Sequence, residues 1–182
     1  MSVKVRILMA GVVFALFVGL ASAQDFQCSY KPAAGSDISI RNVSGDIKVV
    51  GYDGDTFIVT AYKDGRDRDR VEIVDASGED YINIYVSYPR YSNIDASVYF
   101  EIQAPRDVEY NYEDLTSVSG NISISMIAGY VQATSVSGEV QVLDVAGEVK
   151  ASSVSGDVYV QIVNPEPRGN MRFSSVSGDV VV

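Results

Sequence analysis

Apolar and polar residues alternate in short runs along most of the chain. Three of these runs are Glu139-Val140-Gln141-Val142, Glu148-Val149-Lys150-Ala151 and Asp157-Val158-Tyr159-Val160. In an extended strand, strict alternation places the apolar side chains on one face and the polar side chains on the other. The pattern therefore predicts strands of four or five residues, each with one buried face.

Glycines recur between the runs, from 120 to 156 at steps of nine residues. Every second glycine follows Val-Ser and precedes an acidic or amide residue, and further copies of this phrase lie at 43–46 and 176–179. A fixed short period is typical of repeat architectures. Because the chain must bend sharply at each turn, we expect turn glycines that favour a positive φ. These are Gly45, Gly120, Gly129, Gly138, Gly147, Gly156 and Gly178.

A single unit of nine residues cannot bury its valine face, but two units back to back can. We therefore predict an all-β, single-stranded parallel β-solenoid (β-helix-like) with about 18 residues and two short strands per coil, stacked about 4.8 Å apart. The serine before each glycine is expected to hydrogen-bond the local backbone and help close the turn. An internal valine column is expected at Val118, Val136, Val154 and Val176. An outer polar column is expected at Asn121, Glu139, Asp157 and Asp179.

The first part of the domain follows the same pattern less regularly. Segments rich in β-branched and aromatic residues lie at 56–62, 70–74, 81–87 and 97–103, with turn residues between them. We expect one domain over 36–182, with regular repeats over 116–182, preceded by an extension over 24–35. A four-residue insertion near 164–168 contains two prolines and predicts a loop, either a tolerated surface loop or part of a binding face.

The N-terminus has the pattern of an export signal. Lys4 and Arg6 precede an uncharged apolar run over 7–20, and the small residues 21–23 follow it. We therefore expect a signal peptide over 1–23. The alternative is an N-terminal membrane anchor, although the run is short for a spanning helix, which needs roughly 20 residues. Cys28 has no second cysteine to pair with, which leaves a buried thiol or a cross-link between two chains.

The chain is acidic, with 24 Asp and Glu against 14 Lys and Arg. Removal of 1–23 takes away two basic residues and no acidic one, so the formal charge falls from −10 to −12. This charge argues against nucleic acids and anionic membranes as partners. It permits cations, basic proteins and neutral sugars. No other long apolar stretch follows, so no integral membrane segment is expected after signal cleavage.

The residue types limit the chemistry. The chain has no histidine, which excludes Ser-His and Cys-His nucleophile pairs and imidazole metal sites. Each turn offers at most one acidic residue, whereas hard cations take six or more oxygens, so we expect no built metal site, and weak cation binding to the acidic column stays open. The glycines close turns and form no phosphate-binding motif, so we expect no cofactor. Acid–base chemistry on sugars needs two carboxyl groups roughly 5–9.5 Å apart. Stacked coils bring Glu139, Asp157 and Asp179 near one another, but these acids occupy a repeated turn position without cleft-forming loops.

Tyrosine is the most suggestive surface residue. Exposed tyrosines suit contact with proteins or carbohydrates, because they offer a large area and a hydroxyl at a small entropic cost. The alternative is that tyrosine favours strands and covers a half-buried sheet. The candidate binding surface consists of Tyr81, Tyr85, Tyr88, Tyr91, Tyr110 and Tyr112.

The repeated phrases resemble a family of exported bacterial adhesins, also described as a domain of unknown function. The resemblance rests on Val-Ser-Gly-Asp-(Ile/Val)-x-Val phrases, on an N-terminal copy at 42–49 and on the strand 100–105, which ends in proline. It covers about residues 36–182. It implies a β-solenoid outside the cytoplasm, and it implies no shared catalytic residues.

Together these observations predict a non-catalytic envelope or surface module that binds or supports macromolecules. Its expected partner is an envelope or surface protein or a glycan, and its location is the periplasm, the outer surface or the medium. The alternative is a polysaccharide-acting enzyme that uses the repeated carboxylates. The last residues, Val180-Val181-Val182, show no cap, which predicts self-association through the C-terminal coil.

Overall fold

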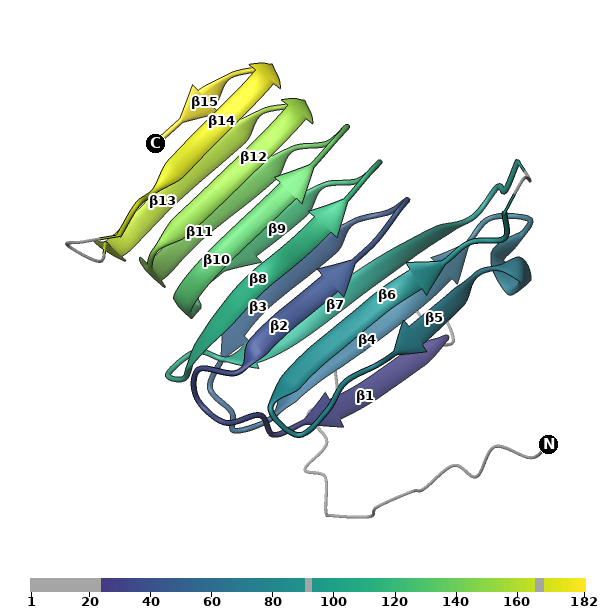
Figure 1. Cartoon of the computed structure of the whole chain (residues 1–182), viewed down its shortest axis with the longest axis horizontal. Helices are drawn as coiled ribbons and strands as arrows, with labels where there is room; N and C mark the ends of the chain where they lie inside the picture. The colour runs from purple at the N-terminus through teal and green to yellow at the C-terminus, as the bar shows by residue number, and fades with distance from the viewer. Residues whose placement is uncertain (1–23, 91–92, 166–168) are drawn as a thin grey trace.

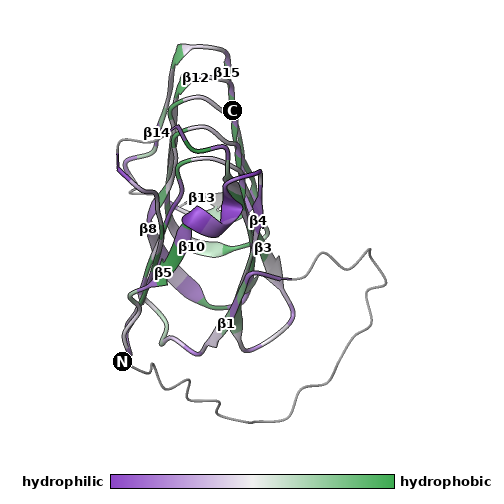
Figure 2. Ribbon diagram, turned by 90° about the vertical axis from the view of Figure 1, so that its right-hand side faces the viewer, coloured by the Kyte–Doolittle hydropathy of each residue, from purple (hydrophilic) through white to green (hydrophobic). Residues whose placement is uncertain are grey.

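The computed structural model describes residues 24–182 except 91–92 and 166–168. The expected signal peptide, Tyr91 and most of the proline-containing insertion therefore lie outside the described residues. Fifteen strands of the described part form one sheet, and a single 3₁₀ helix, η1 (Arg68–Arg70), accompanies them. The sheet folds back on itself, so that two walls face each other (Figures 1 and 2).

The two walls are defined by the order of their strands. The first wall contains β1 (Phe26–Tyr30), β4 (Phe57–Asp64), β7 (Ser97–Pro105), β3 (Ile47–Tyr52), β9 (Ile122–Ser125), β11 (Val140–Gly147), β13 (Val158–Pro165) and β15 (Val180–Val181). The second wall contains β5 (Glu72–Asp75), β6 (Tyr81–Ser87), β2 (Asp37–Arg41), β8 (Glu109–Ser117), β10 (Ala128–Ser135), β12 (Val149–Ser155) and β14 (Arg172–Ser177). The pair Ala128–Ala146 connects β10 to β11 and so joins the walls.

The C-terminal half is a stack of parallel strands with the expected spacing. Val140 lies opposite Ile122 on one side and opposite Val158 on the other, so the register advances by 18 residues per coil. The second wall repeats this step from Val131 to Val149. From Ala151 to Phe173 the step is 22 residues, which equals 18 plus the four inserted residues.

The N-terminal half departs from a parallel solenoid. Strands β1 and β4, β4 and β7, and β5 and β6 pair antiparallel. The turn over 76–80 leads directly from β5 back into β6, and a connection this short permits only antiparallel pairing. The expectation of parallel coils throughout 36–182 is therefore wrong, because the sheet is mixed and resembles a flattened barrel.

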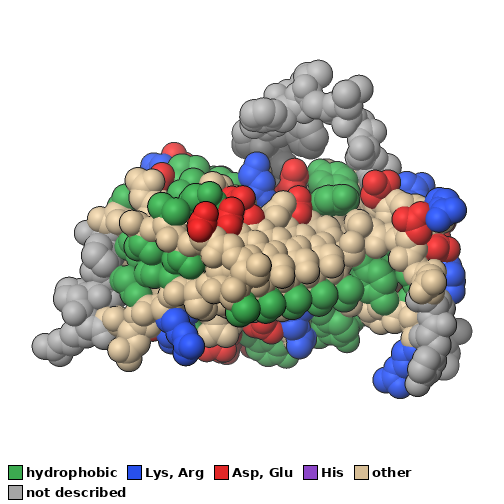
Figure 3. Space-filling view, turned by 90° about the horizontal axis from the view of Figure 1, so that it is seen from above, with side chains coloured by type: hydrophobic (Ala, Val, Ile, Leu, Met, Phe, Trp, Pro, Cys, Tyr) green, Lys and Arg blue, Asp and Glu red, His purple; other side chains and the backbone are tan. Residues whose placement is uncertain are grey.

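The prediction of an internal valine column is also wrong. Val118, Val136 and Val154 are 40–45% exposed, and Val176 is 82% exposed. The alternation of β10 continues inward through Val131, Ala133 and Ser135, so the serine is buried and the next residue faces solvent. With the exposed Val43, these valines form a valine ridge along the turns, and Figure 3 shows a straight row of hydrophobic side chains along this edge.

The buried serines connect neighbouring coils. The Ser135 hydroxyl donates to the Gly120 carbonyl oxygen at 2.9 Å, and the Ser153 hydroxyl donates to the Gly138 carbonyl oxygen at 2.8 Å. The Ser175 hydroxyl donates to Gly156 in the same way. These serines lie three residues before the glycine of their own turn, and their hydroxyls bond the glycine of the coil before. The local bond expected of the serine directly before each glycine stays a prediction.

The glycines of the phrase are required by close packing. A Cβ atom on Gly138 would lie 2.2 Å from the carbonyl oxygen of Gly120, below any ordinary contact distance. Of the seven turn glycines, only Gly45, Gly129 and Gly147 have a positive φ, so that expectation holds for three positions only. The others are glycines because the backbone of the preceding coil passes directly against them.

The outer polar column lies on the surface as expected and also links the coils. The Asp46 carboxylate accepts a hydrogen bond from the N–H of Asn121 at 2.8 Å. The Asn121 side-chain oxygen accepts from the N–H of Glu139, and the Asp157 carboxylate accepts from the N–H of Asp179. These polar side chains therefore contribute to the stacking as well as to solubility.

The two ends of the stack differ. At the N-terminal end, the Tyr30 hydroxyl of β1 donates to the Asp75 carboxylate of β5 at 2.8 Å and so bridges the walls. At the other end, among the described strands, β14 pairs with β12 alone and β15 with β13 alone. Val176, Val180, Val181 and Val182 are exposed there. Self-association through this coil stays a prediction.

Candidate functional site

Tyr110 and Tyr112 belong to the core, so their assignment to a binding surface is wrong. They are 2% and 0% exposed, and both pack against Phe57 of the opposite wall. The rings of Tyr110 and Tyr112 meet edge to face, with centroids 6.2 Å apart. Strand β8 alternates between the two faces, so these tyrosines point inward while Asn111 points outward.

The Tyr112 hydroxyl is buried and has no hydrogen-bond partner among the described residues. Burial raises the pKa of this phenol, and the neighbouring Tyr110 adds to the effect. We expect Tyr112→Phe to increase the free energy of unfolding by about 1 kcal/mol, because it removes an unpaired polar group from the core. Urea unfolding would measure this as a higher midpoint with an unchanged slope.

Tyr88→Phe is the matched control for this change. Tyr88 is half-buried against the core, burial raises the pKa of its phenol, and its hydroxyl donates to the Ala96 carbonyl oxygen at 3.1 Å. The same loss of a hydroxyl should here lower the free energy of unfolding by about 1 kcal/mol. Equal effects of the two changes would contradict the assignment of the Tyr112 hydroxyl as unpaired.

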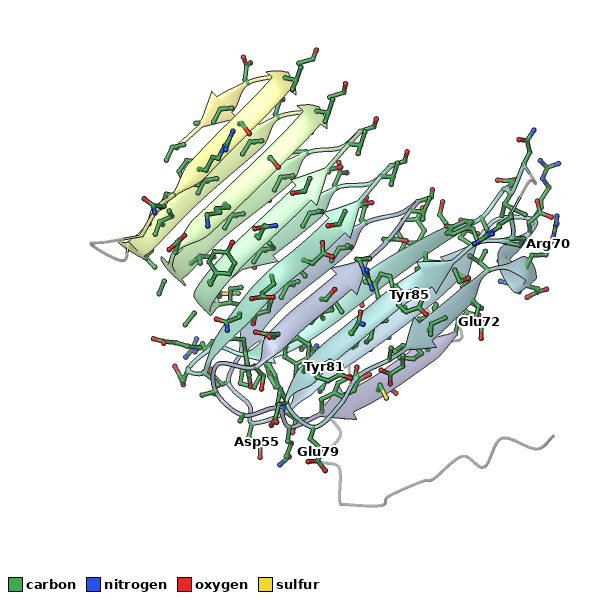
Figure 4. All side chains as sticks on the ribbon, viewed as in Figure 1. Asp55, Arg70, Glu72, Glu79, Tyr81 and Tyr85 are labelled. Carbon is green, nitrogen blue, oxygen red and sulfur yellow. The ribbon has the colours of Figure 1, made fainter. Side chains whose placement is uncertain are left out.

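Two of the candidate tyrosines, Tyr81 and Tyr85, face outward from β6 on the second wall. The parallel register places Asp37 beside Tyr81 and Arg41 beside Tyr85. The Arg41 guanidinium lies over the Tyr85 ring, 5.3 Å from its centroid, and donates to the Asn83 side-chain oxygen at 3.1 Å. We call these five residues the tyrosine surface; Figure 4 labels its two tyrosines along β6.

The tyrosine surface is exposed and open. Tyr81 is 47% exposed, and Tyr85 is held in place by the cation above its ring. Residues four apart on one strand face are separated by about 13 Å. The two rings, with a fixed guanidinium beside one of them, therefore form a strip that suits contact with an extended or flat partner, whereas a small substrate would have no enclosure.

Another outward tyrosine, Tyr130 of β10, was missed from the sequence. The Lys150 ammonium lies 4.9 Å from the centroid of its ring and 3.3 Å from its hydroxyl. Hydrogen bonds to Glu148 and Tyr130 raise the pKa of Lys150 above its usual range. Tyr130 and Lys150 are 20 residues apart, which is one coil of 18 residues plus two, so the repeat places them diagonally on one face of neighbouring strands. This spacing could have predicted the pair from the sequence.

The repeated carboxylates do not gather into one site. A shallow depression of about 310 Å³ on the first wall is lined by residues of β3, β9 and β11 and their turns, with Asp46, Lys48 and Glu139 as its charged members. Of the three carboxylates considered for sugar chemistry, Asp157 and Asp179 lie outside it. Within the described ranges, no group of three or more His, Cys, Asp or Glu residues is placed to hold a metal ion. The same ranges contain no helix of the length and apolarity that crossing a membrane requires.

The sequence over both halves of the sheet matches one known family. A model of the family described as Toastrack DUF4097 matches residues 29–182. The chain belongs to this family. The match agrees with the resemblance to a domain of unknown function, and it spans both the mixed N-terminal half and the stacked C-terminal half of the Toastrack domain.

Two solved structures that match the Toastrack chain have names that refer to adhesion. A "putative cell adhesion protein" from Clostridium sporogenes ATCC 15579 superposes with a TM-score of 0.63 at 11% identity, covering 85% of this chain and 97% of that chain. A "putative adhesin" from Bacteroides fragilis NCTC 9343 has a TM-score of 0.31 at 12% identity, covering 89% and 98%. The first likeness shows a shared fold. A comparison with curated proteins gives no match.

Proposed function

We propose that this Toastrack protein is an exported, non-catalytic module of the cell envelope or surface that binds other macromolecules through the tyrosine surface. The observation that carries the proposal is the Tyr85–Arg41–Asn83 arrangement beside the exposed Tyr81. The cell adhesion name of the Clostridium sporogenes protein supports a role in surface contact. The apolar run before Gln24 supports export.

Tyrosine and arginine suit such a surface for physical reasons. Both are enriched among the residues that dominate binding energy at protein interfaces. Here the hydrogen bond to Asn83 and the contact with the Tyr85 ring restrict Arg41 before any partner arrives. Less side-chain entropy is then lost on binding, so more of the contact energy appears as affinity.

We further propose that the coils over 116–182 act as a β-solenoid support for this surface. The serine-to-glycine hydrogen bonds and the outer polar column tie each coil to the next. Such a stack is rigid along its length, because each coil contacts only its neighbours and does so over its whole outline.

The tyrosine surface is tested by the double change of Tyr81 and Tyr85 to serine. Binding of the purified protein to immobilised cell-envelope fractions of the producing bacterium should weaken by about tenfold or more, since each ring loss removes a central contact. Surface plasmon resonance measures the affinity, and a thermal melt confirms that the double variant and the control variant described next remain folded.

Tyr99→Ser is the matched control, because Tyr99 is similarly exposed on β7 of the first wall. Its affinity should stay within about twofold of the unchanged protein. The proposal would be overturned by equal weakening in the control or by full binding in the double variant.

A further inference from the structure

The second wall carries a basic depression at some distance along the stack from the tyrosine surface. It spans β10, β12 and β14, and it is an open surface depression of about 350 Å³. Its polar lining consists of Gln132, Thr134, Lys150, Ser152, Arg172 and Ser174. No acidic side chain lines it, although the whole chain has 24 acidic and 14 basic residues.

Two cations stand side by side in this depression. Lys150 and Arg172 are directly opposite in the parallel register of β12 and β14. Like charges at directly opposite positions are destabilising. Lys150 is partly balanced by Glu148, whose carboxylate lies 3.1 Å from its ammonium, whereas Arg172 makes no ion pair with any described residue. An anion placed between the two cations would remove this repulsion.

Neutral hydrogen-bonding groups surround the cations in two rows. Gln132 lies opposite Lys150 and continues the row of Arg172. The second row is Thr134, Ser152 and Ser174, and the Thr134 and Ser152 hydroxyl oxygens are 3.1 Å apart. Hydroxyl and amide groups at strand spacing, about 4.8 Å, match the several hydroxyls of a sugar ring.

We propose that the basic depression binds an acidic sugar residue of a polysaccharide, with its carboxylate held between Arg172 and Lys150. The planar guanidinium accommodates a carboxylate through two parallel hydrogen bonds. The two polar rows bind the sugar hydroxyls. Densely charged polyanions such as nucleic acids fit less well, since the net charge of −10 repels them at longer range. The inference rests on the proposed binding function, because it gives that module a ligand class, but it uses different residues.

The test is calorimetric titration of the purified protein with trigalacturonate as the acidic probe and maltotriose as the neutral one. Saturable binding of trigalacturonate alone is expected. Arg172→Gln and Lys150→Gln should each weaken it by about tenfold or more, as expected for lost charge-assisted hydrogen bonds. Lys48→Gln, which removes a cation from the depression on the first wall, should leave the affinity unchanged.

Three results would overturn the inference. They are the absence of saturable trigalacturonate binding, equal binding by Arg172→Gln, and equal binding of maltotriose. A fourth arm uses inorganic phosphate as competitor: displacement at the same concentration as trigalacturonate would show a simple anion site and would overturn the sugar assignment.

The test of the basic depression can fail or succeed independently of the test of the tyrosine surface. The Tyr81 and Tyr85 double variant should bind trigalacturonate normally, because β6 does not border the depression. Normal sugar binding together with unaltered envelope binding by that variant would reject the tyrosine surface and retain the basic depression. Lost sugar binding by Arg172→Gln with intact envelope binding would support the basic depression as a site separate from the one that binds the envelope.

Discussion

Gly138→Ala is expected to lower the free energy of unfolding by about 3 kcal/mol or more. The added methyl group would lie 2.2 Å from the carbonyl oxygen of Gly120 and 2.6 Å from its carbonyl carbon. Both atoms belong to the backbone of the adjacent coil, so no side-chain rotation relieves the contact. The coils must separate locally, which weakens the nearby hydrogen bond from the Ser135 hydroxyl to the Gly120 carbonyl oxygen and costs more than ordinary overpacking in a core.

Substitutions at two other glycines distinguish the cost of the close contact from the cost of the left-handed backbone conformation. Gly35 has φ +81°, and no atom lies within 4 Å of the place that an added methyl group would take, so Gly35→Ala measures the left-handed conformation alone, about 1–2 kcal/mol. Gly147 has φ +142° and a contact of 2.1 Å with the Gly129 carbonyl oxygen, so Gly147→Ala combines both costs. Urea unfolding should rank the losses as Gly147, then Gly138, then Gly35. A loss at Gly138 no larger than at Gly35 would show that the coils are not closely stacked.

The repeat period was sufficient to predict the stacked half of the fold. Strands that alternate apolar and polar residues, separated by glycines at nine-residue steps, fix both the strand length and the 18-residue register seen from Ile122 to Val158. This pattern does not predict the antiparallel pairs of the N-terminal half. Whether a strand such as β4 pairs parallel or antiparallel depends on which distant strands it meets, and its own sequence alternates in the same way for both.

The side-chain directions at the turns were predicted incorrectly for a physical reason. Serine is usually polar and exposed, so a buried Ser135 beside an exposed Val136 reverses the ordinary preference. The reversal is stable because the buried hydroxyl has a partner, the Gly120 carbonyl, that exists only once the coils are stacked. A partner contributed by another coil cannot be recognised from the local sequence.

The candidate site was predicted in part. Tyr81 and Tyr85 lie outward on β6, while the same tyrosine-rich composition placed Tyr110 and Tyr112 in the core. Whether a tyrosine faces the core or the solvent depends on its place in the inward–outward alternation of its strand. An irregularity in β8 between Tyr112 and Leu115 interrupts this alternation, so the facing of one part of the strand does not predict that of the other. The cluster of Arg41, Asn83 and Tyr85 was missed because Arg41 lies 42 residues from Asn83 and 44 residues from Tyr85 in the sequence.

Val140→Asp should abolish folding, whereas Val136→Asp should leave the protein folded. Val140 is fully buried between Ile122 and Val158, and an unpaired carboxylate there costs a large part of the about 5–15 kcal/mol by which domains of this kind are stable. Val136 is 40% exposed on the valine ridge, where the new charge stays hydrated and changes stability by about 0.5 kcal/mol.

Circular dichroism measures whether each variant keeps its strand content, and urea unfolding gives the stability of the folded one. A neutral pair keeps the comparison quantitative if Val140→Asp yields no soluble protein. Val140→Thr should lose about 1–3 kcal/mol, because its hydroxyl is buried without a partner, and Val136→Thr should lose almost nothing. The opposite order, with greater losses at Val136, would restore an internal valine column and would contradict the inward position of Ser135, since the two residues are adjacent and cannot both point into the core.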